Sequence, residues 1–216
     1  MKRYYVGVFG VFLVLFLAMF SYPVRADLPL QGKVVAIDSG HGGLDPGSLY
    51  NDIYEKDITL SIGKYLENYL SEMGATVIMT RTSDNDLSNG ARNHRKKADF
   101  DERIKIINQN IVDMYVSIHL NYLTDTRYYG AQVFYNKDNE NLAKSIQEYL
   151  NKNTDTNREI KKIPTSTYMY DKLTTKGVLV ECGFLSNAME RSKLVTKEYQ
   201  IKFAKVLAEA ISHYYS

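Results

Sequence analysis

Two histidines and two glutamates in this 216-residue sequence lie where they could activate water for hydrolysis. His41 follows an apolar run that stops at an aspartate and breaks into glycines. His119 lies near the end of a second such run, Glu181 ends a third, and Glu55 begins an amphipathic helical pattern. Two imidazoles and a carboxylate, with one position left open for water, are a common catalytic zinc site. These residues predict that His41, Glu55 and His119 bind zinc and that Glu181 transfers protons as a general base.

Each of these residues also has a purely structural interpretation. Glu55 stands three positions after Asp52 and could close a capping box at the start of its helix. His119 could be a hydrogen-bonded core histidine, and the glycine-rich turn could hold an inert His41. Glu181 could pair with a lysine, although an acidic residue at the end of so apolar a strand is uncommon in a structural role. The site is absent only if all four structural interpretations hold together.

Strand and helix patterns alternate along the chain. Strands are expected at residues 33–38, 75–80, 114–121, 130–135 and 177–181, with helices at 55–73, 101–108, 139–150 and within 188–216. The polar stretches 82–99 and 151–166 are expected to be surface loops. Alternating strands and helices predict an α/β single domain with a mostly parallel sheet and helices on both faces. In such a sheet the carboxyl ends of the strands meet at one edge, where ligands bind.

The composition is that of a globular domain and argues against a nucleic-acid-binding protein. Hydrophobic residues make up 44% of the chain and charged residues 24%, which is typical of one globular domain. The net charge of +2 is too small to indicate a nucleic-acid-binding protein. The single cysteine, Cys182, excludes an intramolecular disulfide, so the stability must come from the core or from a metal.

The N-terminal segment has the features of an export signal. Two basic residues precede an apolar stretch at positions 6–20, and Ala26 ends a suitable cleavage sequence. We therefore expect residues 1–26 to be a signal peptide, or an uncleaved membrane anchor. In both cases the catalytic domain, residues 27–216, is exported, and the membrane is contacted only through this segment.

Four segments, in this order, resemble the zinc-dependent N-acetylmuramoyl-L-alanine amidases of bacterial cell walls, most of all the germination-specific, spore-cortex subgroup. They are Ile37-Asp38-Ser39-Gly40-His41-Gly42-Gly43 with Asp45-Pro46-Gly47, Glu55-Lys56-Asp57, Ser117-Ile118-His119-Leu120-Asn121, and Val180-Glu181-Cys182-Gly183-Phe184-Leu185-Ser186-Asn187. The resemblance extends over residues 33–216. It implies a sheet of about six strands and one catalytic Zn²⁺ held by His41, Glu55 and His119, with Glu181 catalytic.

The reaction implied by this resemblance is hydrolysis of the amide between the lactyl group of N-acetylmuramic acid and L-alanine of the stem peptide. In the cortex subgroup this exposes muramic acid for conversion to muramic-δ-lactam. Asn121 and Tyr129 are expected to contact the peptidoglycan substrate, and a protein activator or targeting partner is a further expectation. The protein would act in the cell wall or the forespore intermembrane space, secreted or anchored. Two alternatives stay open: a zinc peptidase that cleaves within the stem peptide, and a catalytically silent peptidoglycan-binding protein.

Overall fold

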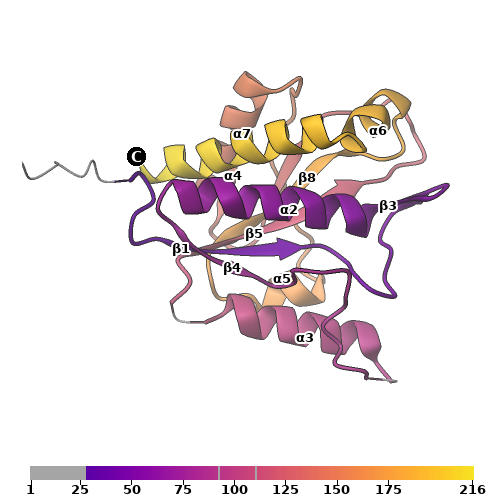
Figure 1. Cartoon of the computed structure of the whole chain (residues 1–216), viewed down its shortest axis with the longest axis horizontal. Coiled ribbons are helices and arrows are strands. Elements are labelled where there is room, and N and C mark those ends of the chain that lie inside the picture. The colour runs from indigo at the N-terminus through magenta and orange to yellow at the C-terminus, as the bar shows by residue number, and fades with distance from the viewer. Residues whose placement is uncertain (1–27, 92, 110) are drawn as a thin grey trace, which may run out of the picture.

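A computed structural model describes residues 28–216 except residues 92 and 110, so the expected signal peptide or anchor lies outside the described residues. The centre of the fold is a six-stranded sheet with the strand order β4-β1-β5-β8-β6-β7 (Figure 1). Its strands are β1 (Val34–Ser39), β4 (Thr76–Met79), β5 (Met114–Asn121), β6 (Gln132–Tyr135), β7 (Lys161–Lys162) and β8 (Gly177–Phe184). A separate small hairpin consists of β2 (Leu49–Tyr50) and β3 (Ile53–Tyr54).

The first four strands of this order are parallel to one another, and β6 pairs with β8 in the antiparallel sense. The sheet is therefore mostly parallel, as predicted. Its register places Ser39 opposite Ile118 and His119 opposite Glu181. The carboxyl ends of β1, β5 and β8 thus lie side by side at one edge, the arrangement in which α/β folds bind ligands.

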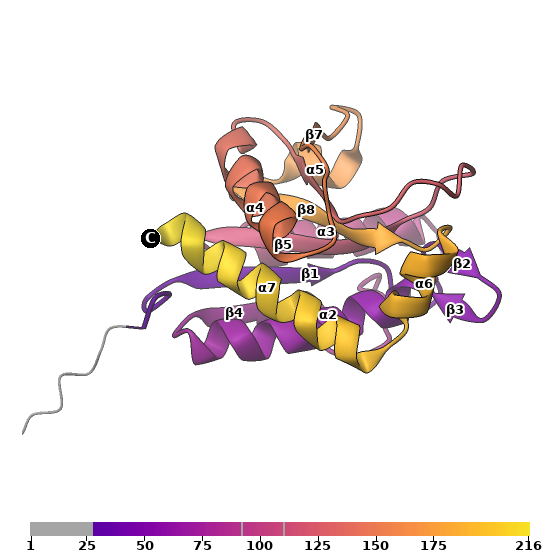
Figure 2. The ribbon, with the colours of Figure 1, turned by 90° about the horizontal axis from the view of Figure 1, so that it is seen from above.

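Helices cover both faces of the sheet, which confirms the predicted α/β architecture (Figures 1 and 2). On one face lie α2 (Glu55–Glu72), α4 (Glu140–Asn153) and α7 (Lys197–Tyr215), and on the other lie α3 (Arg95–Ile107) and α5 (Tyr168–Lys172). A short helix, α6 (Ala188–Leu194), follows β8. Among the described helices, none combines the length and the apolar character needed to cross a bilayer.

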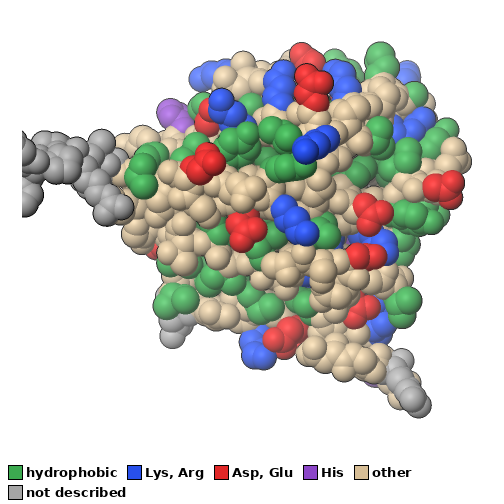
Figure 3. Space-filling view, in the orientation of Figure 1, with side chains coloured by type: hydrophobic (Ala, Val, Ile, Leu, Met, Phe, Trp, Pro, Cys, Tyr) green, Lys and Arg blue, Asp and Glu red, His purple; other side chains and the backbone are tan. Residues whose placement is uncertain are grey.

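Successive side chains of a strand point to opposite faces of the sheet, so the strands contribute to two separate cores. On β5, Val116 and Ile118 enter the core beneath α2, α4 and α7, whereas Tyr115 enters the smaller core beneath α3 and α5. Ser117 and His119 share the face of Tyr115. On the surface in the orientation of Figure 3, basic and acidic side chains are scattered among one another.

Several expected boundaries were wrong. Helix α3 begins at Arg95, six residues before the expected start, because Arg95 and Lys96 form ion pairs with Asp86 and Asp45. These tertiary contacts offset the unfavourable placement of basic residues in a first helical turn. Strand β7 and helix α5 lie where no element was expected, and β8 continues to Phe184. The C-terminal segment contains two helices, separated where Thr196 caps α7.

Candidate active site

His41 lies in a tight loop that leaves the carboxyl end of β1. Its backbone is left-handed, with φ of 62°, and it is followed by two glycines that also have positive φ. Gly40 is required at its position because a Cβ there would lie 2.4 Å from Cε1 of His119. The loop therefore places its backbone directly against one imidazole while it presents the other.

Two buried arginines hold the carbonyl groups of this loop. Arg81 donates through Nη2 to the Gly40 carbonyl at 2.9 Å, and Arg103 donates through Nη2 to the His41 carbonyl at 2.6 Å. Arg103 also pairs through Nη1 with the buried Asp38 carboxylate at 2.7 Å. Burial raises the pKa of Asp38, but Arg103 and a hydrogen bond from Ser117 outweigh that effect and hold the pKa below its usual value. An ionic network thus fixes the loop that carries His41.

Glu55 is the first residue of α2 and is only 2% exposed. Its Oε2 accepts a hydrogen bond from the Ser48 amide at 2.7 Å, and its Oε1 accepts one from the Leu120 amide at 2.9 Å. The residue before the helix, Tyr54, makes no capping hydrogen bond through its side chain. Glu55 therefore bridges the glycine-rich loop and β5 instead of closing a capping box with Asp52.

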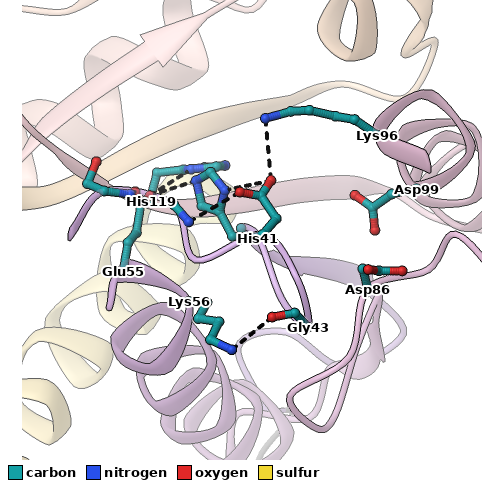
Figure 4. Close-up of polar contacts among 12 residues, drawn as sticks. His41, Gly43, Glu55, Lys56, Asp86, Lys96, Asp99 and His119 are labelled. Atoms are coloured by element: carbon teal, nitrogen blue, oxygen red, sulfur yellow. Dashed lines mark hydrogen bonds and ion pairs between the residues drawn. The ribbon is translucent and has the colours of Figure 1, made fainter. Parts of the chain in front are cut away.

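The three predicted ligand atoms converge on one point (Figure 4). Nε2 of His41 is 3.2 Å and Nδ1 of His119 is 3.0 Å from Oε1 of Glu55, and one donor atom from each residue lies within 4.8 Å of the others. The edges of a tetrahedron with zinc–ligand bonds of about 2.1 Å are about 3.4 Å long. Two imidazoles and one carboxylate at these separations fit the donor set of a zinc ion.

The charges around His41 favour a cation at this point. Nδ1 of His41 is 3.1 Å from Oδ2 of Asp45, which also pairs with Lys96 at 3.3 Å. Burial lowers the pKa of His41, but the Asp45 and Glu55 carboxylates outweigh burial and raise it to about 9. Burial likewise raises the pKa of Glu55, yet the two histidines hold it well below its usual range. The Asp45 and Glu55 carboxylates thus favour positive charge at the His41 imidazole.

Glu181 lies beside this cluster on the neighbouring strand, in register with His119. Its Oε2 is buried and has no hydrogen-bond partner, and the described residues provide no ion pair for it, so the proposed lysine pairing is not observed. Burial raises the pKa of Glu181 to about 7, with His119 opposing the shift and Glu55 adding to it. A carboxylate with a pKa near neutrality and a free oxygen is suited to take up and release a proton.

The cluster and Glu181 line an open cleft of about 480 Å³. Asn121 lines this cleft, together with Lys96 and Tyr122. Tyr129, the other predicted substrate contact, is 55% exposed and is not one of the lining residues, so its role stays a prediction.

The polar residues that support the ligands are not predicted by the patterns in the sequence. Lys96 was assigned to a surface loop, and no pattern indicated that Tyr170 of α5 approaches His119. One indication was present in β5. Ser117 is two residues before His119, so its side chain lies on the same face of the strand.

The chain is thus an α/β domain with helices on both faces of its sheet and a candidate His–Glu–His metal site at the carboxyl edge of that sheet. The sequence matches the N-acetylmuramoyl-L-alanine amidase family (Amidase_3) over residues 35–213, and the chain is a member of that family.

Individual relatives agree with this assignment. The germination-specific N-acetylmuramoyl-L-alanine amidase of Bacillus subtilis is 41% identical over 196 residues, which cover 88% of this chain and 82% of the relative. Among solved structures, the CwlD amidase of Clostridioides difficile, determined in complex with the GerS lipoprotein, superposes with a TM-score of 0.78 at 38% identity, covering 84% of this chain and 98% of that one. The catalytic domain of CwlV from Bacillus (Paenibacillus) polymyxa var. colistinus gives 0.73 at 28% identity, covering 84% and 97%.

Proposed function

We propose that this protein hydrolyses the amide bond between the lactyl group of N-acetylmuramic acid and L-alanine of the peptidoglycan stem peptide. The observation that carries the proposal is the convergence of His41, Glu55 and His119 beside the unpartnered Glu181 in an open cleft. The membership of the chain in the amidase family selects this bond from the amides that such a site could cleave.

Zn²⁺ fits the donor atoms of His41, Glu55 and His119, and when bound it lowers the pKa of water and polarises a carbonyl group. Hydrogen bonds within the protein hold these donors in place. Glu55 is fixed by two backbone amides, and the His41 loop is fixed by Arg103. This pre-organisation reduces the rearrangement that binding requires.

Glu181 performs the proton transfers in this proposal. Its carboxylate takes a proton from the attacking water as the oxygen bonds to the lactyl carbonyl carbon. The same proton then passes to the alanine nitrogen as the carbon–nitrogen bond breaks, which gives a free amino group and a lactyl carboxylic acid that loses its own proton to the solvent. A pKa near 7 suits both steps, because the group must be a base first and an acid afterwards.

Action on the spore cortex is the finer part of the proposal, supported by the germination-specific relative. There the exposed muramic acid would be available for conversion to muramic-δ-lactam. The proposal includes export by the N-terminal segment, because peptidoglycan lies outside the cytoplasmic membrane. It also includes a protein partner, since the CwlD amidase was solved with a lipoprotein.

The decisive experiment is digestion of purified peptidoglycan by residues 27–216 with added zinc, followed by mass spectrometry of the products. We expect free stem peptides that begin at L-alanine. Glu181→Gln should keep its zinc and lose about 10²–10⁴-fold of the rate, because the amide can no longer accept a proton.

Other products would favour the alternatives. Glycan that retains L-alanine would identify a peptidase, and protein that binds peptidoglycan without metal or turnover would identify a silent binding protein. Undiminished activity of Glu181→Gln would refute the assignment of the general base.

A further inference from the structure

The second ring nitrogen of His119 faces a chain of buried hydroxyl groups. Nε2 of His119 is 3.4 Å from the Tyr170 hydroxyl, which is 3.0 Å from Oγ of Ser117. Ser117 in turn donates to Oδ2 of Asp38 at 2.6 Å. Tyr170 is 7% exposed, Ser117 is 0% exposed and Asp38 is 1% exposed, so the chain runs through the protein interior.

The ionised carboxylate at the far end sets the direction of every hydrogen bond in this chain. Arg103 pairs with Asp38 at 2.7 Å and keeps it anionic, so Asp38 can only accept. Ser117 must therefore use its single hydrogen on Asp38, and its oxygen can only accept from Tyr170. The Tyr170 hydrogen is then used in turn, and its oxygen is left to accept a hydrogen from Nε2 of His119.

We infer that Tyr170 is a positioning residue that holds His119 in the Nε2-protonated tautomer, with the Nδ1 lone pair directed at the metal point. Nδ1 is the nitrogen that lies 3.0 Å from Glu55. The inference rests on the proposed zinc site and deepens it. A ligating histidine is commonly fixed through its other nitrogen by a carboxylate, a carbonyl or water. Here the hydroxyl groups of Tyr170 and Ser117 connect the histidine to the buried Asp38 carboxylate.

Removal of the Tyr170 hydroxyl should weaken zinc binding without disrupting the fold. Loss of a group that orients a ligand in this way commonly costs 10–100-fold in metal affinity. Because the 3.4 Å contact is long and Tyr170 is uncharged, we expect about tenfold for Tyr170→Phe. The phenylalanine ring retains the packing of Tyr170 in the smaller core.

The chain offers a matched control on the same face of the sheet. Tyr115 is also fully buried in this core, but its hydroxyl contacts Asn136 at 3.3 Å and has no contact with the ligands. The experiment measures zinc affinity of the full chain and its Tyr170→Phe, Ser117→Ala and Tyr115→Phe variants by competition with a chromophoric chelator. Long-range proton–nitrogen NMR of the zinc-loaded protein reads the tautomer directly, and only four histidines contribute to the spectrum.

We expect weaker zinc binding and a faster-exchanging Nε2 proton of His119 in Tyr170→Phe, a smaller loss in Ser117→Ala, and wild-type affinity in Tyr115→Phe. Thermal unfolding of the metal-free proteins separates these effects from folding, and Ser117→Ala carries the test if Tyr170→Phe does not fold. Wild-type affinity and tautomer in both variants, or an equal loss in Tyr115→Phe, would overturn the inference. A wild-type protein without stoichiometric zinc would instead overturn the proposed site itself.

Discussion

Replacement of Arg103 by methionine should cost a substantial part of the stability of the domain. Arg103 is 2% exposed, and it pairs with Asp38 at 2.7 Å and with Asp99 at 2.8 Å. Methionine fills a similar volume but leaves both carboxylates without their cation. Breaking a buried ion pair from one side costs about 3–5 kcal/mol, and natural domains are stable by about 5–15 kcal/mol. We expect a loss of about 4 kcal/mol.

The loss should also depend on pH. In the wild type the folded-state pKa of Asp38 is below its usual value, so its stabilising contribution is complete above the unfolded value and constant between pH 5 and pH 7. In Arg103→Met, burial without a cation raises the folded-state pKa above the unfolded value. The folded variant then gains a proton as the pH falls, and its deficit in unfolding free energy shrinks from pH 7 to pH 5.

Urea unfolding of the metal-free proteins, followed by far-ultraviolet circular dichroism because the chain lacks tryptophan, measures both effects. The control is Lys105→Met on the same helix, which removes an exposed ion pair with Glu102 and should cost well under 1 kcal/mol. The double variant Asp38→Asn, Arg103→Met should recover part of the loss. A deficit that is the same at both pH values, and is not reduced in the double variant, would refute the electrostatic explanation.

Three further predictions concern the metal point. Zinc at 1,000 times its dissociation constant should stabilise the domain by about 4 kcal/mol and so raise its melting temperature. The variant His119→Ala should not show this increase. An equal increase in that variant would mean that zinc binds elsewhere. Since the pKa of His41 is about 9, zinc binding at pH 7 should release at least one proton, and zinc affinity should fall about tenfold per pH unit below 9. Calorimetry in buffers of different ionisation enthalpy counts the released protons. Release of no proton would contradict the assignment of His41 as a zinc ligand. Gly47→Ala would place a Cβ 2.6 Å from Cδ2 of His41 and 2.7 Å from Oε2 of Glu55, whereas Gly90→Ala, also at positive φ, meets nothing within 4 Å. Only Gly47→Ala should weaken zinc binding in the chelator assay. Equal losses of zinc affinity in the two variants would mean that backbone strain, and not the contact with the ligands, is the cause.

The predictions that succeeded rest on patterns within single segments. The apolar runs before His41, around His119 and before Glu181 proved to be strands with their carboxyl ends at the site, so these three residues could be placed from sequence alone. The parallel order of these strands then brought the residues together, as the alternation of strands and helices implies.

The wrong and the missing predictions concern contacts between distant segments. The start of α3 is stabilised by Asp86 and Asp45, which no helical pattern around residue 95 reveals. The approach of Tyr170 to His119 spans 51 residues, and it arises from the packing of a five-residue helix that has too few residues for a periodic pattern. Local propensity cannot report such contacts, because they form only when the sheet is complete.

The position of α7 links the candidate site to a part of the core that lies away from the cleft. This helix packs against α2, whose first residue is Glu55. Phe203 and Leu207 of α7 belong to the same buried core as Ile62 of α2, although no residue of α7 lines the cleft. Because close-packed interiors transmit strain, a substitution in the core face of α7 acts on the helix that holds Glu55 in place.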